Sequence, residues 1–188
     1  LEADEVRTTR VEGKLAVLKQ RLDVQTRNGS SPIGIGHTRW ATHGRPSDDN
    51  AHPHRAGRVS LVHNGIIENY VALRTDLQKR GAVFTSETDT EIAAHLLNSF
   101  LEAGEEPFQA LKDACAEIIG SFAFLAFDSQ HTDRLLVAKN ATPLIIGQGK
   151  DEMFVASDIP AVLEHTRDII ILEDGDVAEV RVDAIVIE

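Results

Sequence analysis

The stretch from Gly34 to Gly65, GIGHTRWATHGRPSDDNAHPHRAGRVSLVHNG, decides how the chain is organised. It holds five of the eight histidines and the only tryptophan. Residues 33–38 and 58–62 are short apolar segments that each predict a strand, and His63-Asn64-Gly65 predicts a turn at the end of the second one. The polar residues 39–57 between them predict a long loop. Loops of that length in a compact domain are usually functional.

Length and composition narrow the class of protein. At 188 residues with 42% apolar content, the chain predicts one globular domain over 1–188. A formal net charge of -11 without a basic run argues against a nucleic acid or an anionic membrane as partner, and favours a small polar ligand. The single cysteine, Cys115, excludes an intrachain disulfide, and no apolar stretch is long enough to span a membrane. We therefore expect a cytoplasmic protein.

The remaining elements fall into a group of helices followed by a group of strands. After a first strand over 6–11, helices are expected from Gly13, over 66–80, after Ser86–Asp89 and from Pro107 to Gly120, because apolar residues recur there every three or four positions. From Gly120 onward the period changes, which predicts strands and one short helix; the strands are 122–127, 135–139, 144–146, 153–156, 169–172, 177–182 and 185–187, and the helix is 159–165. This order favours an α+β domain whose helices cover sheets.

Asn64 and Gly65 suggest one chemical function. Together they can offer a side-chain amide and a backbone N–H in one turn, two donors that suit a developing oxyanion. Asn-Gly is also a common turn dipeptide, so a purely structural turn is the stronger reading of these two residues alone.

Four further residues suggest the binding of charged groups. Arg39 near Thr42 and His43 can hold a carboxylate, although a surface ion pair is the simpler alternative. Asp89, at the first turn of a helix, is more often a cap than a ligand for an ammonium group. Trp40 is more often a core residue than part of a lid, although its neighbours here are polar.

The histidines also allow a metal site, which we consider less favoured. His52-Pro53-His54 would supply two ligands, with His37, His43, His63 or Asp89 as further ones; the spacings match no standard zinc signature. Nor do the residues present a nucleophile, since no Gly-x-Ser-x-Gly motif occurs and Cys115 lies on the inner face of a predicted helix. We therefore expect neither a metal nor a cofactor.

Four motifs in order resemble the glutaminase domain of the glutamine:fructose-6-phosphate aminotransferase family of class II amidotransferases. They are HTRWATHG at 37–44, NAHPH at 50–54, HNGIIENY at 63–70 and SETDTE at 86–91. The similarity extends from about Val11 to the C-terminus. The resemblance implies a four-layer αββα sandwich of the N-terminal nucleophile hydrolase type, and L-glutamine as substrate.

The resemblance also implies roles for nine residues. Arg39, Thr42 and His43 would bind the α-carboxylate of glutamine, Asp89 its α-ammonium, Asn64 and Gly65 the oxyanion, Trp40 would lie beside the ammonia route, and His52 and His63 would support the loop and the turn.

In this family the nucleophile is a cysteine at the mature N-terminus, and its thiolate attacks the glutamine amide. The present chain begins at Leu1. We therefore expect it to be a piece of a longer, dimeric enzyme with C-terminal sugar isomerase domains, and to be inactive alone. The alternative is a non-catalytic glutamine-binding or regulatory module.

Overall fold

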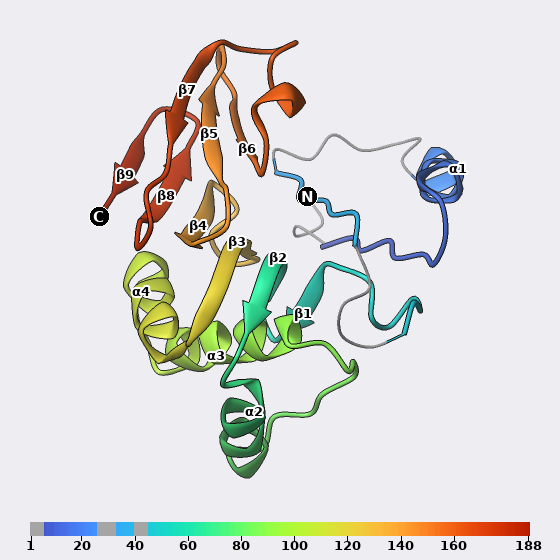
Figure 1. The fold of residues 1–188 in the computed structure, drawn as a ribbon, viewed down its shortest axis with the longest axis vertical. Helices are drawn as coiled ribbons and strands as arrows, with labels where there is room; N and C mark the ends of the chain where they lie inside the picture. Colours follow the sequence, from blue (N-terminus) through green and yellow to red (C-terminus); the bar gives the residue numbers. More distant parts are fainter. Residues whose placement is uncertain (1–5, 26–32, 40–44) are drawn as a thin grey trace.

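The structure is a computed structural model that describes residues 6–25, 33–39 and 45–188. It contains two sheets and a group of helices (Figure 1). In chain order the elements are α1 (Leu15–Gln25), β1 (His54–Ala56), β2 (Val59–Ile67), α2 (Tyr70–Lys79), α3 (Thr90–Glu102), α4 (Pro107–Glu117), β3 (Gly120–Asp128), β4 (Arg134–Asn140), β5 (Ile145–Gln148), β6 (Met153–Ala156), the 3-10 helix η1 (Ile159–Ala161), β7 (Asp168–Ile171), β8 (Val177–Arg181) and β9 (Ile185–Ile187). No helix in the described part of the chain is long and apolar enough to cross a membrane.

Both sheets are antiparallel. The larger has the strand order β1-β2-β3-β4-β8-β9, and the smaller has the order β6-β5-β7. Strand β3 lies near the middle of the larger sheet and is almost continuously apolar. Side chains alternate between the two faces of a strand, so this composition requires cover on both faces.

The larger sheet has one core on each face. Phe122, Phe124 and Ala126 of β3 pack in the core that also contains apolar residues of α2, α3 and α4, so these helices cover that face. Ala123 and Leu125, from the same strand, pack in a second core with residues of β5 and other strands. The smaller sheet therefore covers the opposite face, above the larger sheet in Figure 1.

A helical turn covers the outer face of the smaller sheet. Ile146 of β5 packs toward the larger sheet, so Gly147 faces outward. A Cβ added at Gly147 would lie 3.0 Å from Thr166 and 3.6 Å from Val162, both in the segment that follows η1. The layers are thus helices, sheet, sheet and an outer helical turn, which is the order expected for the α+β sandwich.

The expected strands over 6–11 and 33–38 are wrong. Both segments are irregular where the structure describes them, because neither forms a ladder with another described strand. The first contacts the loop before β1, since Arg10 Nη1 donates to the backbone carbonyl oxygen of Asp49 at 3.3 Å.

Several expected boundaries are also wrong. The helix expected over 159–165 is only the 3-10 helix η1, and the loop expected over 39–57 contains strand β1. Residues 63–65 are not a turn but part of β2, because β3 pairs with them along its length. The helix expected over 66–80 begins only at Tyr70, since Ile66 and Ile67 continue the strand. Its expected stop at Gly81 is confirmed, with φ of 96° at that glycine.

Helix α3 begins beneath a loop that its own second residue holds in place. The carboxylate of Glu91, 1% exposed, accepts hydrogen bonds from the backbone N–H groups of Thr85 and Ser86 at 2.8 and 2.7 Å, and from both of their hydroxyls. Burial raises the pKa of Glu91, but these hydrogen bonds outweigh it and the pKa is lowered. The loop over 85–89 is therefore fixed by one ionised side chain.

We expect Glu91→Ala to lower the free energy of unfolding by about 3 kcal/mol, because it leaves two inward-facing backbone N–H groups without an acceptor. Urea unfolding measures the change. Glu117→Ala, which removes an exposed carboxylate at the end of α4, is the matched control and should stay within about 0.5 kcal/mol of wild type. Equal midpoints for the two variants would contradict the role of Glu91.

Candidate active site

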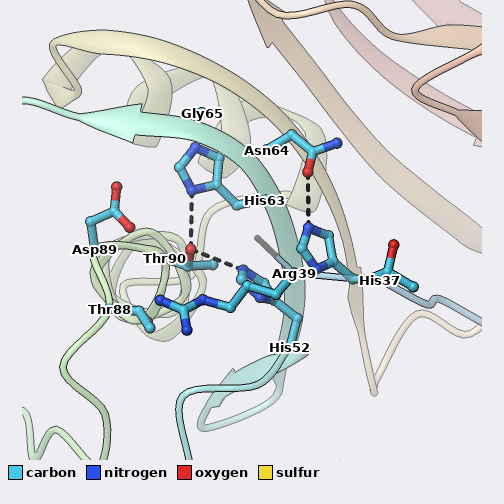
Figure 2. Close-up of a pocket in the computed structure, with 10 residues that line it drawn as sticks. His37, Arg39, His52, His63, Asn64, Gly65, Thr88, Asp89 and Thr90 are labelled. Carbon is cyan, nitrogen blue, oxygen red and sulfur yellow. Dashed lines mark hydrogen bonds between the residues drawn. The ribbon is translucent and has the colours of Figure 1, made fainter. Parts of the chain in front are cut away.

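A cavity of about 280 Å³ lies where β2, the first turn of α3 and the segment 33–39 meet (Figure 2). Its volume is near the lower end of small-molecule pockets, about 300–1,000 Å³. Its walls are polar; the residues that line it are His37, Thr38, Arg39, His52, His63, Asn64, Gly65, Thr88, Asp89 and Thr90.

Strand β2 supplies three of these residues, His63, Asn64 and Gly65. They pair with residues 122–124 of β3, so their backbone is fixed by the larger sheet. Gly65 has φ of 134°, a conformation that side chains rarely permit, and the chain therefore needs glycine there. The positive φ also turns the peptide groups at Gly65 away from the orientation of an ordinary strand residue.

The first turn of α3 supplies Asp89 and Thr90. Asp89 precedes the helix, but its side chain makes no capping hydrogen bond. Instead Asp89 Oδ2 accepts a hydrogen bond from the backbone N–H of Ile67 at 2.9 Å, which joins the start of α3 to the end of β2. Asp89 is only 6% exposed, so a buried carboxylate stands at this side of the cavity.

The segment 33–39 supplies the opposite wall. Figure 2 shows the Arg39 side chain extended across the cavity, between the side that carries Asp89 and the side that carries Asn64. His37 Nε2 lies 2.8 Å from Asn64 Oδ1, and this contact joins the segment to β2. The cavity thus has a guanidinium and a carboxylate on its walls, together with an Asn-Gly pair.

A single hydroxyl connects three parts of the wall. Thr90 Oγ1 lies 3.0 Å from His52 Nε2 and 3.0 Å from His63 Nδ1 (Figure 2). A hydroxyl carries one hydrogen, so at least one of the two rings must donate to it. The loop before β1, β2 and α3 are therefore held together at this point.

The histidines around the cavity are kept neutral by burial. Burial lowers the pKa of His63 and of His54 to about 4 each, and it lowers the pKa of His52 as well. His54 Nε2 lies 3.0 Å from the hydroxyl of Thr88, on the loop that leads to Asp89. Among the described residues no group of three or more His, Cys, Asp or Glu side chains is arranged to hold a metal ion.

Cys115 is not part of the cavity lining that the structure describes. It lies on α4, and burial raises the pKa of its thiol to about 12. A thiol is nucleophilic only as the thiolate, so Cys115 is unreactive near neutral pH. Cys115 is half-buried and packs against the core beneath the helices, so its expected place on the inner face of a helix is confirmed.

The cavity brings together six of the nine residues that the resemblance singles out; these are Arg39, His52, His63, Asn64, Gly65 and Asp89. The other three, Trp40, Thr42 and His43, lie outside the described residues. Sequence reasoning missed Thr90, the first residue of the helix expected after Asp89, and it considered His37 only as a metal ligand. The signal for both was their position inside the motifs at 37–44 and 86–91.

The fold and the cavity indicate the class of protein, which is an amidotransferase. The glutamine phosphoribosylpyrophosphate amidotransferase of B. subtilis is similar in structure, with a TM-score of 0.67 and 26% identity over 81% of this chain and 33% of that one. The allosteric regulatory enzyme of purine biosynthesis has a TM-score of 0.64 and 25% identity, over 76% of this chain and 31% of its own. The N-terminal nucleophile hydrolase sandwich that the resemblance implies is confirmed.

Residues 37–164, more than half of the chain, match the family model described as a glutamine amidotransferase domain. The chain belongs to this family. It is 45% identical over 178 residues to the glutamine–fructose-6-phosphate aminotransferase (isomerizing) of Clostridium tetani, and 47% identical over 176 residues to that of Bradyrhizobium diazoefficiens. Each match covers 94% of this chain and 29% of the relative, so the chain spans under a third of the length of these relatives.

Proposed function

We propose that residues 1–188 form the glutaminase domain of a longer enzyme that makes glucosamine 6-phosphate from fructose 6-phosphate. The domain would hydrolyse L-glutamine to glutamate and ammonia, and C-terminal sugar isomerase domains would accept the ammonia. The names of the relatives and the share of their length that the chain covers support this division.

The arrangement of charges in the cavity is the observation that carries the proposal. Free glutamine is a zwitterion, so a site for it needs a cation for the α-carboxylate and an anion for the α-ammonium. Arg39 and Asp89 line one cavity and supply the two charges. Thr42 and His43 would add to the carboxylate site, and Trp40 would lie beside the ammonia route.

The glutamine side chain would then reach the Asn-Gly pair of β2. When a thiolate attacks the amide carbon, negative charge moves to the carbonyl oxygen. The side-chain N–H of Asn64 and the backbone N–H of Gly65 are the donors that would stabilise it, and both belong to a strand held in the larger sheet. His52 and His63, both bonded to Thr90, would hold this geometry. The resemblance assigns the attacking thiolate to an N-terminal cysteine of the mature enzyme.

The proposal includes the setting of the enzyme. We infer a cytoplasmic homodimer, with no metal or cofactor needed for glutamine hydrolysis. The predicted absence of a membrane or nucleic-acid partner rests on the net charge of -11 and the lack of a basic run.

Asp89→Asn tests the ligand role in the intact enzyme. Loss of the negative charge leaves a bound ammonium without its counter-ion, which should raise the KM for glutamine about 30-fold or more, at about 2–5 kcal/mol for a buried charged pair. Hydrolysis of 4-carbamoylbutanoate, which is glutamine without its amino group, should change little, because that substrate has no cation to lose.

Asp76→Asn on α2 is the control, since it makes the same change of a carboxylate to an amide but at an exposed position away from the cavity. Ammonia-dependent sugar amination should be retained in both variants. If Asp89→Asn lowers the melting temperature but leaves the glutamine KM within about twofold of wild type, Asp89 is structural and the assignment fails. Binding of glutamine without any hydrolysis by the intact protein would favour the non-catalytic module instead.

A further inference from the structure

His37 and Asn64 form a hydrogen bond whose direction is determined by chemistry. The acceptor is Asn64 Oδ1, 2.8 Å from His37 Nε2. An amide oxygen carries no hydrogen, so the ring nitrogen must donate. The bond joins residues 27 positions apart and lies at the cavity wall, where both side chains are labelled in Figure 2.

The proton state of His37 agrees with this direction. Burial lowers the pKa of His37 by more than its contacts with the Asn64 side chain and the His63 backbone raise it, so the ring is neutral near pH 7 and carries one hydrogen. With that hydrogen on Nε2, Nδ1 is left as a bare lone pair. Nδ1 is buried and has no hydrogen-bond partner among the described residues, as expected for the nitrogen without a hydrogen.

The direction of the bond decides which end of the Asn64 amide faces the cavity. The terminal torsion of asparagine has two broad, nearly equivalent orientations related by a half turn. In the observed one, Oδ1 points to His37 and Nδ2 points away from it (Figure 2); in the other, Oδ1 takes the place of Nδ2 and would repel a developing oxyanion. A donor at His37 stabilises the first orientation and disfavours the second.

We propose that His37 is a positioning residue for amide hydrolysis: its Nε2–H holds Asn64 Oδ1 and thereby presents Asn64 Nδ2 to the oxyanion. This inference rests on the proposed function, because it needs Asn64 to be an oxyanion donor. In this role His37 acts through Asn64 and not directly on the reacting atoms. Its effect should therefore appear in kcat for glutamine and leave substrate binding unchanged.

Three substitutions in the intact enzyme separate this role from simple packing. His37→Leu removes the donor and should lower kcat for glutamate release about ten- to hundredfold, below the roughly 10²–10³ lost with an oxyanion donor itself, while KM stays within about twofold. His37→Gln places an amide N–H at nearly the position of Nε2 and should recover most of kcat. His37→Glu can only accept near pH 7; it should pull the Asn64 amide into the wrong orientation and fall below His37→Leu.

A double-mutant cycle with Asn64→Ala completes the test. Once Asn64 is gone, His37→Leu should cause no further loss of kcat. Equal losses for the Leu, Gln and Glu variants, or an additive loss in the double variant, would overturn the positioning role. An unchanged kcat for Asn64→Ala would overturn the proposed oxyanion site as well, so the two failures are distinguishable.

Discussion

Gly65→Ala is expected to disrupt both the fold and the proposed activity. We expect the free energy of unfolding to fall by about 4 kcal/mol or more, at the upper end of single substitutions. Glutamine hydrolysis by the intact enzyme should fall by at least about 10²-fold, the loss typical of one oxyanion donor. Urea unfolding and glutamate release measure the two effects.

Two observations explain why a side chain at Gly65 is not tolerated. A Cβ at Gly65 would overlap the backbone carbonyl oxygen of Ser121 and lie 2.9 Å from His63 Nε2. The obstacle on the β3 side is backbone, which cannot move aside without separating β2 from β3. The φ of 134° adds strain for any residue with a side chain, on the order of 1–3 kcal/mol.

Gly34→Ala is the matched control. A Cβ at Gly34 meets no atom of the described residues within 4 Å, and this glycine is not among those with positive φ. Its stability should equal or slightly exceed that of wild type, by about 0.4–1 kcal/mol at most, because alanine restricts the unfolded chain. Similar unfolding midpoints for the two variants would contradict the structural requirement at Gly65.

Acidification should lower the free energy of unfolding already between about pH 6.5 and 4, before most carboxylates take up protons. The unfolded chain binds protons at its histidines below about pH 6.5, whereas burial lowers the pKa of His54 and of His63 to about 4 in the folded state. The folded state therefore loses stability as pH falls from about 6.5 to 4. Each such histidine contributes roughly 3 kcal/mol over this range, at about 1.4 kcal/mol per pH unit.

Urea unfolding at a series of pH values between 4 and 8 measures this dependence. His54→Gln can keep a hydrogen bond to Thr88 without taking up a proton, so its unfolding free energy should change less with pH than that of wild type. His165→Gln removes an exposed histidine and is the matched control. If wild type shows a flat profile down to pH 4.5, the buried histidines are not neutral as the structure indicates.

Local sequence patterns predicted the C-terminal half of the fold well. The strands over 153–156 and 185–187 match β6 and β9 residue for residue, and the start of α4 matches Pro107. Strands there are dense in β-branched and aromatic residues and are separated by turn residues, so local preference and tertiary pairing agree. Helix α3 was predicted because apolar residues recur there every three or four positions, and its tertiary packing agrees with that local pattern.

Prediction from local pattern failed where tertiary contacts override it. Asn64-Gly65 favours a turn by composition, yet β3 pairs with this dipeptide and draws it into a strand. Asp89 has the position of a helix cap, but its carboxylate accepts from the N–H of Ile67, 22 residues earlier. The candidate site residues were identified by resemblance to a family. Their hydrogen-bond partners lie too far away in the sequence to leave a local pattern.

The Thr90 hydroxyl also has a consequence for how the cavity forms during folding. Its two bonds, to His52 and His63, span 38 and 27 residues, and neither can exist before α3 docks against β2. Contacts between distant parts of a chain form late relative to local ones, because a long loop must close first. A peptide over 33–67 would carry most of the cavity's side chains without the helix that fixes them. The candidate site is therefore a product of complete folding and has no local precursor.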